Sequence, residues 1–471
     1  MALLLPGTSV GYSAGAVVDE SIFKAYDVRG IYPDQMDEAL AYRIGRGFAR
    51  VLCDLQDIRM ADLRVGVGRD MRLTAPAITD RYISVLADEG ADVLDLWMVG
   101  TEMLYWTVGS RDLDGGLMCT ASHNPADYTG AKLVKRGALA LSGDSGIGEL
   151  REIVTAGEPG GPAAQPGRVE RDDVGDAFRE AALGYIDADI KPLKVVLDGG
   201  NGMAGPMLGP LLDRFPLEQT RLYWEPDGEF PDHEPNPLLE ENRRFIIDKV
   251  READADLGIA WDGDADRCFF IDDMGEFVAG DFLTALLAEA LLRKEPGATV
   301  LYDVRASRAV ADIVDGHGGT AMVNRVGHAF FKTRMRETGA AFGGEVSGHY
   351  YFRDFYCADS GTLPALLLLE LLSVEGKKLS ELLEPLRSRY FISGEINSEV
   401  SDQDAKTDEL RSEYSDGRLD ELDGISIDYD DWHFNVRPSN TEPLIRLNLE
   451  SLVSREHMEE KRDELLELIR A

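Results

Sequence analysis

Short apolar segments, each followed by a loop and then an amphipathic segment, recur through the first three quarters of this chain. One such segment runs over residues 63–68, a helical pattern covers 75–89, and a second apolar segment follows at 91–96. Strand, loop, helix and strand in this order are typical of a βαβ unit. Similar apolar segments occur at 194–197 and 299–302. Because strand and helix patterns alternate, the sequence predicts an α/β fold.

The chain has more than one domain. Its 471 residues exceed what one hydrophobic core supports, and three or four domains are expected for this length. Residues 155–167 are rich in Gly and Pro and carry no apolar periodicity, so they are the clearest domain boundary. Near Arg389 the composition becomes acidic and hydrophilic, which predicts a smaller unit that ends in an amphipathic helix at 455–469.

The charge of the chain excludes several classes of partner. Its net charge is −37 and its calculated pI is near 4.5, which opposes binding to nucleic acid or to an anionic membrane. We interpret the charge as a solvation feature that suits high salt, where screening weakens self-repulsion. An ordinary acidic cytoplasmic protein is the alternative. Stability in low salt separates the two.

Targeting and cysteine signals favour a reduced, cytoplasmic compartment. No stretch approaches the roughly 20 apolar residues that span a bilayer. The first residues, 1–6, are apolar but lack the basic region of a signal peptide. The four cysteines form no CxxC pair and no disulfide-like spacing. We expect a monomer or a weak homodimer.

The peptide Thr-Ala-Ser-His-Asn-Pro at 120–125 follows an apolar segment at 116–120 and presents Ser122 in a turn. Ligands of open α/β sheets lie at such carboxyl ends of strands. Adjacent side chains in a turn often diverge, so His123 is not automatically the base for Ser122. We favour a serine that is already phosphorylated and acts as a donor. A turn without chemistry is the alternative. Lys132 is a candidate charge stabiliser or acid, although a single lysine is more often a surface residue.

Three aspartates at alternate positions, Asp262, Asp264 and Asp266, follow an apolar strand at 256–261. Their carboxylates can converge on a hard cation, and Mg²⁺ prefers such oxygen ligands. A calcium-binding EF-hand loop is disfavoured because Arg267 replaces its glycine. Arg267 beside a cation makes sense only if an anion is also present. A solvated acidic turn is the alternative.

Two further peptides offer ligand-binding groups. The segment Gly-Glu-Val-Ser-Gly-His at 344–349 presents a carboxylate, a hydroxyl and an imidazole, which suits a polyhydroxylated ligand. His328, which precedes Lys332, and His349 are candidate acid or base groups because histidine titrates near neutral pH.

The segment Arg-Pro-Ser-Asn-Thr-Glu-Pro at 437–443 combines a guanidinium, hydroxyls and an amide in one turn. Such a turn can bind an anion. An N-cap or an ordinary proline turn is the alternative.

Five peptides occur in one order along nearly the whole chain: FKAYDVRG, TASHNP, DGDADR, GEVSGH and RPSNTEP. Together they resemble the α-D-phosphohexomutase family, most closely its phosphomannomutase/phosphoglucomutase branch. The resemblance implies three related mixed-sheet α/β domains and a smaller C-terminal α/β domain around a central cleft. We place these domains at 1–166, 167–277, 278–390 and 391–471, with a hinge near residue 390.

The resemblance also implies an intramolecular phosphotransferase that interconverts hexose 1-phosphate and hexose 6-phosphate through a phosphoserine and a 1,6-bisphosphate. It implies hexose phosphates as substrates, one Mg²⁺ per chain and a hexose 1,6-bisphosphate as activator. The catalytic positions it implies are Ser122, Lys132, Arg267, His328 and His349. The substrate-binding positions it implies are Tyr26, Arg29, Glu345, Ser347, Arg437, Ser439, Asn440 and Thr441. The metal positions it implies are Ser122, Asp262, Asp264 and Asp266.

The chain departs from the family pattern at a few positions. Thr129-Gly130 replaces the usual Asn-Gly, and Thr101-Glu102 stands where many members have Thr-Pro, so both loops are in doubt. Val346 is apolar where phosphoglucosamine mutases carry Gln, which disfavours that branch. A metal-dependent phosphatase and a non-catalytic sugar-phosphate-binding paralogue remain alternatives. The choice between mannose and glucose, and between the two histidines as base, stays open.

Overall fold

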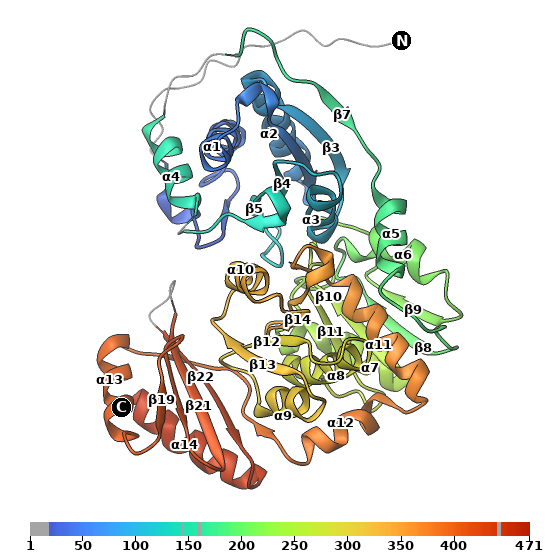
Figure 1. The fold of residues 1–471 in the computed structure, drawn as a ribbon, viewed down its shortest axis with the longest axis vertical. Helices are drawn as coiled ribbons and strands as arrows, with labels where there is room; N and C mark the ends of the chain where they lie inside the picture. The colour runs from blue at the N-terminus through green and yellow to red at the C-terminus, as the bar shows by residue number, and fades with distance from the viewer. Residues whose placement is uncertain (1–17, 144, 158–161, 440–443) are drawn as a thin grey trace. The chain divides into compact units, whose positions relative to one another are not determined.

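The structure is a computed structural model that describes residues 18–143, 145–157, 162–439 and 444–471 (Figure 1). The chain divides into two compact units. The smaller unit holds the described residues up to Val99 together with Thr107–Ala121 and Ala126–Asp173. The larger unit holds Gly100–Trp106, Ser122–Pro125 and Val174–Ala471. Two short segments of the N-terminal part therefore group with residues that follow much later in the chain.

The smaller unit contains one mixed sheet with strand order β1-β5-β4-β2-β3-β7, and β6 pairs with β5. Its strands are β1 (Asp27–Ile31), β2 (Arg64–Arg69), β3 (Asp92–Met98), β4 (Gly115–Cys119), β5 (Tyr128–Lys135), β6 (Leu139–Ala140) and β7 (Val169–Arg171). The helices of this part of the chain are η1 (Glu20–Ile22), α1 (Glu38–Gln56), η2 (Met60–Asp62), α2 (Ala75–Glu89), α3 (Thr101–Ser110), η3 (Arg136–Ala138) and α4 (Ile147–Ala156). The first half of α3 belongs to the larger unit.

Local sequence explains why α1 and α2 form and pack together. The side chain of Asp37 accepts a hydrogen bond from the backbone N–H of Leu40 at 2.7 Å and so caps α1. Ile44 and Phe48 lie one turn apart on its buried face. Between them, Gly45 lets α2 approach, because a Cβ added there would lie 2.5 Å from Val85. The core of this unit therefore forms between these helices and the central strands.

The second sheet, in the larger unit, has strand order β11-β10-β8-β9. Its strands are β8 (Lys194–Asp198), β9 (Glu218–Leu222), β10 (Leu257–Trp261) and β11 (Cys268–Ile271). The helices around it are α5 (Gly175–Leu183), α6 (Ala204–Leu212) and α7 (Glu240–Ala253). β10 runs parallel to β8, so the loops after Trp261 and Asp198 both lie at the carboxyl ends of the strands.

The third sheet has strand order β13-β12-β14-β15-β16. Its strands are β12 (Thr299–Asp303), β13 (Thr320–Asn324), β14 (Phe342–Gly344), β15 (Tyr350–Phe352) and β16 (Ala358–Asp359). The helices are α8 (Gly280–Lys294), α9 (Arg308–Gly316), α10 (His328–Thr338), η4 (Arg353–Phe355), α11 (Thr362–Glu375) and α12 (Leu379–Arg387). α11 is apolar on every side and is buried over most of its length, so it forms part of the core.

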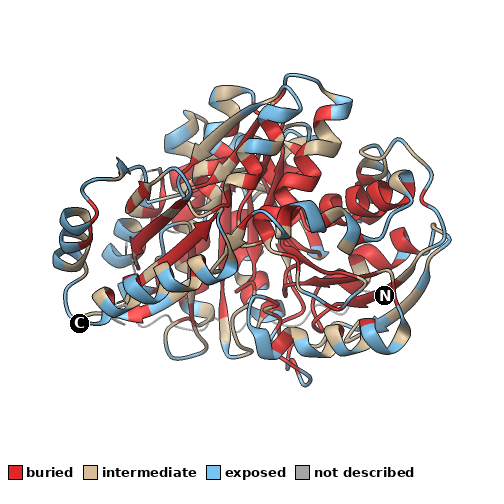
Figure 2. Ribbon diagram, turned by 90° about the horizontal axis from the view of Figure 1, so that it is seen from below, coloured by how far each residue is buried: buried red, intermediate tan, exposed pale blue. Residues whose placement is uncertain are grey.

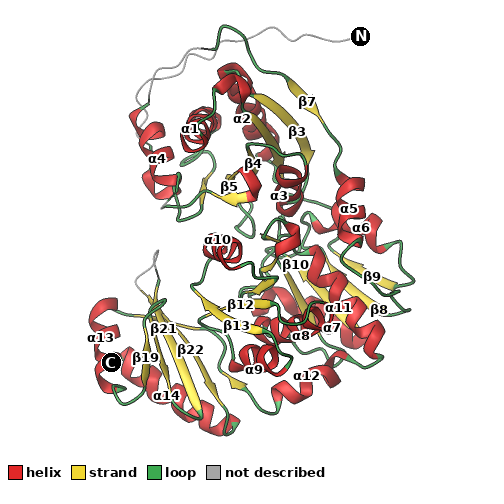
Figure 3. Ribbon diagram, in the orientation of Figure 1, coloured by secondary structure: helices red, strands yellow, loops and turns green. Residues whose placement is uncertain are grey.

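The fourth sheet has strand order β17-β22-β21-β20-β19, and β18 pairs with β22 (Figure 3). Its strands are β17 (Phe391–Ile392), β18 (Ile396–Glu399), β19 (Arg418–Asp420), β20 (Ile425–Asp428), β21 (Trp432–Pro438) and β22 (Leu444–Ser451). The helices are α13 (Gln403–Glu413) and α14 (Arg455–Arg470). Many strands are buried, whereas β7 and β19 at sheet edges and the outer faces of many helices are exposed (Figure 2).

The predicted α/β class is confirmed, and several predicted elements coincide with observed ones. The helix predicted at 75–89 is α2, and the strand predicted at 256–261 is β10 with one residue fewer. The domain limits stay a prediction. β7 pairs with β3, which extends the first sheet past residue 166, and residues 158–161 lie outside the described part of the chain. Among the described residues, every helix is too short or too polar to cross a membrane.

Candidate active site

Three buried carboxylates follow strand β10. Asp262, Asp264 and Asp266 are 0%, 0% and 1% exposed, and each offers an oxygen within 4.8 Å of the others. Burial of like charges at this separation is strongly unfavourable unless a positive charge offsets it. Oxygen donors in this arrangement fit a hard divalent cation such as Mg²⁺. The loop predicted to bind a metal is therefore formed by residues that suit one.

Arg267 supplies part of the compensating charge. Its Nε donates to Oδ2 of Asp262 at 2.9 Å, and its backbone N–H donates to Oδ1 of the same residue at 3.2 Å. Its side chain is 4% exposed. Arg267 therefore keeps Asp262 in place and brings one guanidinium to the three carboxylates. A cation held by these oxygens would add further compensating charge.

Ser122 lies directly on this acidic loop. Its hydroxyl donates to Oδ2 of Asp262 at 2.9 Å, and its backbone has φ +52°, in the left-handed region. The close approach requires glycine at position 263, since a Cβ there would lie 2.5 Å from the carbonyl oxygen of Ser122. His123 Nδ1 lies 3.3 Å from the Ser122 hydroxyl oxygen. The two neighbouring side chains of this turn therefore converge, in contrast to the divergence that is usual in turns.

A second group of side chains lies in the loop between β14 and β15. Glu345 accepts hydrogen bonds from the Tyr351 hydroxyl at 2.5 Å and from the Gly327 N–H at 2.8 Å. Burial, with the nearby charge of Asp303, raises the pKa of Glu345 to about 7. The Ser347 hydroxyl lies 3.2 Å from His349 Nδ1.

His349 links this loop to the acidic loop. Its Nε2 lies 4.0 Å from an oxygen of Asp266 and 4.0 Å from an oxygen of Asp359. The rings of His328 and His349 stack with centroids 6.3 Å apart. Lys332 is buried, with Nζ 2.6 Å from Asp359 and 3.7 Å from the centre of the Tyr105 ring. The structure thus brings together both predicted histidines and one predicted metal ligand.

Asp359 and Arg305 belong to this neighbourhood, and sequence reasoning missed both. Asp359 ends β16 in a peptide without a motif, so only the strand end signalled it. Arg305 follows β12 and pairs with Asp303 at 2.8 Å and with Glu395 at 3.3 Å. Asp303 in turn accepts the N–H of Val346 at 2.9 Å.

The predicted anion-binding turn begins at the end of β21. Arg437 lies 3.4 Å from Glu395 and 3.8 Å from Asp423. Ser439 is 8% exposed, and its N–H donates to the carbonyl of Leu444 at 2.9 Å. Asn440 and Thr441, which were predicted to complete the turn, lie outside the described residues.

Three predicted site residues belong to the smaller unit. Arg29 pairs with Asp27 at 2.6 Å and donates to the carbonyl of Ala121 at 3.3 Å. Lys132, on β5, is opposite Asp27 on β1 and is 6% exposed. Tyr26 directly precedes β1. These residues gather at the β1–β5 edge of the first sheet.

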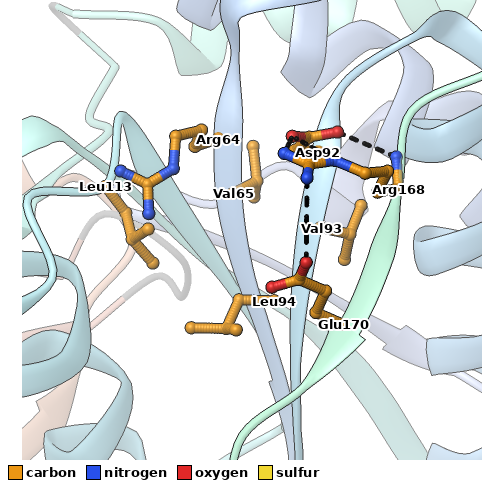
Figure 4. Close-up of a pocket in the computed structure, with 8 residues that line it drawn as sticks. All are labelled: Arg64, Val65, Asp92, Val93, Leu94, Leu113, Arg168 and Glu170. Carbon is orange, nitrogen blue, oxygen red and sulfur yellow. Dashed lines mark hydrogen bonds and ion pairs between the residues drawn. The ribbon is translucent and has the colours of Figure 1, made fainter.

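A hollow of about 100 Å³ in the smaller unit lies away from that edge (Figure 4). It opens where β2, β3 and β7 begin, and Arg168 spans it by pairing with Asp92 at 2.6 Å and with Glu170 at 3.9 Å. Its wall consists of Arg64, Val65, Asp92, Val93, Leu94, Leu113, Arg168 and Glu170. None of these residues carries a predicted function.

Comparison with known proteins matches all four parts of the chain to phosphoglucomutase/phosphomannomutase domains. Residues 20–159, 176–275 and 279–390 match the alpha/beta/alpha domains I, II and III, and residues 395–468 match the C-terminal domain. The chain belongs to the phosphoglucomutase/phosphomannomutase family. The resemblance predicted from five peptides is thereby confirmed, together with the four-domain α/β architecture.

Individual relatives cover nearly the whole chain. A relative named "Phosphohexose mutases" from Xanthomonas campestris pv. campestris (strain B100) is 42% identical to this chain. The match covers 95% of this chain and 99% of the relative. Phosphomannomutase from Escherichia coli (strain K12) is 41% identical over 95% of this chain and 98% of its own. A solved phosphoglucomutase/phosphomannomutase family protein from Burkholderia thailandensis is 34% identical with a TM-score of 0.87, covering 96% of this chain and 98% of its own.

Proposed function

We propose that this chain is a phosphomannomutase/phosphoglucomutase that interconverts hexose 1-phosphate and hexose 6-phosphate. The observation that carries the proposal is the Ser122 hydroxyl, 2.9 Å from Asp262 within a loop of three buried carboxylates. A serine in this position is placed to carry a phosphoryl group beside a cation. Membership of the family and relatives named phosphomannomutase support the same activity.

The reaction begins with a phosphoryl group on Ser122. A sugar hydroxyl attacks the phosphorus, the bond to the Ser122 oxygen breaks, and the serine keeps the electron pair. Asp262, Asp264 and Asp266 would hold Mg²⁺, which when bound offsets negative charge on the phosphoryl oxygens. Arg267, which already holds Asp262, lies beside the same charge and adds a guanidinium. The bisphosphate then turns within the site and returns its other phosphoryl group to Ser122.

His349 is the base that the geometry favours for the attacking hydroxyl. It lies 4.0 Å from Asp266 and 4.0 Å from Asp359, so it faces the acidic loop and has a second carboxylate to stabilise its protonated form. His328 stacks behind it. Glu345 and Ser347 lie in the same loop and would bind sugar hydroxyls.

Other residues would hold the non-reacting phosphate. Arg437 and Ser439, with Asn440 and Thr441 from outside the described residues, fit this role by residue type. Tyr26, Arg29 and Lys132 of the smaller unit are proposed to contact the substrate or the transferring group, because they match the family's motif positions. One Mg²⁺ per chain and activation by a hexose 1,6-bisphosphate complete the proposal.

A coupled mutase assay tests the function. Mannose 1-phosphate and glucose 1-phosphate are compared with Mg²⁺ and trace glucose 1,6-bisphosphate, in low and high salt. We expect turnover that EDTA removes and that Ser122→Ala abolishes, with an intact-mass gain of one phosphate on the wild-type chain alone. No turnover of either sugar in any salt would contradict the proposal, and the ratio of kcat/KM assigns the preferred sugar.

We further propose that the enzyme acts in the cytoplasm as a monomer or weak homodimer with small-molecule partners, and without nucleic acid or membrane. Its strong negative charge supports this, since phosphate backbones and anionic lipids would repel it. Size-exclusion chromatography with light scattering at several salt concentrations tests the oligomeric state. A stable higher oligomer would contradict it.

A further inference from the structure

Thr101 and Glu102 begin helix α3 and belong to the larger unit, together with the acidic loop and the residues around β16. Both are 0% exposed. In the sequence, the dipeptide is a departure from the family pattern. In the structure each of its two side chains bonds to a different loop of the site.

Thr101 bonds to a proposed metal ligand. Its hydroxyl donates to Oδ2 of Asp264 at 2.5 Å, and its backbone N–H donates to the Asp264 carbonyl at 3.1 Å. The threonine thus holds both the main chain and the carboxylate of Asp264. A carboxylate that is held at one oxygen presents the other in a single orientation, which lowers the cost of ordering it around an ion.

Glu102 bonds to the turn after β16. It accepts hydrogen bonds from the hydroxyls of Ser360 and Thr362, and from the Thr362 N–H at 3.4 Å. Ser360 directly follows Asp359, whose carboxylate lies 4.0 Å from His349. Glu102 is therefore bonded to the turn that directly follows Asp359.

The turn after β16 also packs against the acidic loop. The indole N–H of Trp261 donates to the Gly361 carbonyl at 2.9 Å. A Cβ at Gly361 would lie 2.4 Å from the carbonyl oxygen of Ala265. Ala265 itself has φ +60°, a strained conformation that its surroundings must maintain. The two loops held by Thr101 and Glu102 are thus in direct contact.

We propose that Thr101 and Glu102 are positioning residues with separate duties: Thr101 orients Asp264 for the cation, and Glu102 sets Asp359 against His349. The role of Glu102 rests on the proposed mutase function, whereas the role of Thr101 in orienting a metal ligand does not. Neither residue touches the reacting atoms; each acts through the residue that it holds.

Binding of Mn²⁺ to the full, EDTA-stripped chain tests the role of Thr101 without any turnover. Electron paramagnetic resonance gives the Kd for wild type, Thr101→Val and Thr101→Ser, with Thr79→Val as a buried control in the smaller unit. Loss of a residue that orients a metal ligand costs about 10–100-fold in affinity. We expect a Kd raised by that factor in Thr101→Val, restored in Thr101→Ser and unchanged in Thr79→Val. An unchanged Kd in a folded Thr101→Val variant would overturn this half.

Steady-state kinetics with Mn²⁺ binding tests Glu102. In Glu102→Leu we expect kcat to fall about 10–100-fold, the loss typical when a residue that holds a site residue in place is removed, with KM and the Mn²⁺ Kd within about threefold of wild type. Glu102→Gln keeps a hydrogen-bonding side chain, so its kcat should fall less. This variant also provides the test if Glu102→Leu does not fold.

Two results would overturn the role of Glu102. An unchanged kcat in both variants would show that the turn needs no clamp. A loss of Mn²⁺ affinity equal to that of Thr101→Val would show one shared scaffold in place of two duties. An inactive wild type would instead count against the mutase proposal. The Mn²⁺-binding experiment would still decide whether Thr101 orients a metal ligand.

Discussion

The acidic loop after β10 and the end of strand β21 are both charged, yet they balance their charges differently. Asp262, Asp264 and Asp266 cluster as carboxylates, and the guanidinium of Arg267 pairs with Asp262 at 2.9 Å. Arg437, in contrast, lies within 3.8 Å of two carboxylates, and one of these, Glu395, also pairs with Arg305 and Arg446. Among the described residues, the first site is therefore a cluster of like charges, whereas the second is a network of arginine–carboxylate pairs.

We infer from this difference that the first site suits a bound cation and the second a ligand that comes and goes. Clustered carboxylates in a buried loop favour occupation by a cation. A network in which arginines already pair with carboxylates can exchange one anion for another. A phosphate would bind by drawing Arg437 away from Glu395, so that little charge is left uncompensated in either state.

The largest expected effect is at the acidic loop. Asp264→Asn keeps the shape of the side chain but removes one negative charge, and we expect kcat to fall about 10³-fold with loss of Mn²⁺ binding. Mutase assays and paramagnetic resonance measure the two effects. Full activity in this variant would mean that the carboxylate of Asp264 serves no cation.

Glu450 is a third kind of buried acidic side chain, in which burial favours the uncharged form. Its pKa is raised to about 7 by burial, although the N–H of Arg308 donates to it at 3.2 Å. The folded chain keeps this proton up to about pH 7, whereas the unfolded chain loses it near pH 4.5. Stability from this group is therefore lost as the pH rises through that range, by about 3 kcal/mol.

Glu450→Gln should remove this pH dependence. Relative to wild type, the variant should gain about 3 kcal/mol in free energy of unfolding between pH 4.5 and pH 8, as measured by chemical denaturation. Glu460→Gln on the exposed side of α14 is the matched control. Parallel pH profiles for Glu450→Gln and wild type would contradict the expectation.

At the end of β21, a smaller effect on binding is expected. Arg437→Gln should raise KM about tenfold and change kcat little, because a charge-assisted hydrogen bond to a non-reacting phosphate contributes about 1.5–3 kcal/mol to binding. Arg418→Gln, which replaces an exposed arginine of the same domain, should leave KM unchanged. A fall in kcat with constant KM would place Arg437 at the reacting group and break the comparison.

The smallest effect tests the exchange of anions directly. Glu395→Gln removes the carboxylate that competes for Arg437, and we expect KM to fall about threefold, within the range of a partly exposed ion pair. The salt dependence of KM should weaken as well. A higher KM would mean that Glu395 holds the arginines in their binding positions and does not compete with phosphate.

The sequence alone predicted those parts of the candidate site whose residues lie close together in the chain. Ser122 and the three aspartates occur in short peptides at strand ends, and the period of 75–89 defined α2. Thr101, Glu102 and Asp359 carry no local sequence pattern. Thr101 bonds to Asp264, which is 163 positions away, and Glu102 bonds to Ser360, which is 258 positions away. Such pairs depend on how the sheets pack, which no periodicity records.

The grouping of Gly100–Trp106 and Ser122–Pro125 with the larger unit has a consequence for synthesis of the chain. Domains generally fold in the order in which the ribosome releases them. The first sheet is complete once β7 has emerged, but Ser122 must wait for Asp262, and Glu102 for Ser360. The serine loop is therefore made early and ordered late, so a nascent or prematurely terminated chain carries Ser122 without the acidic loop that it contacts in the folded protein.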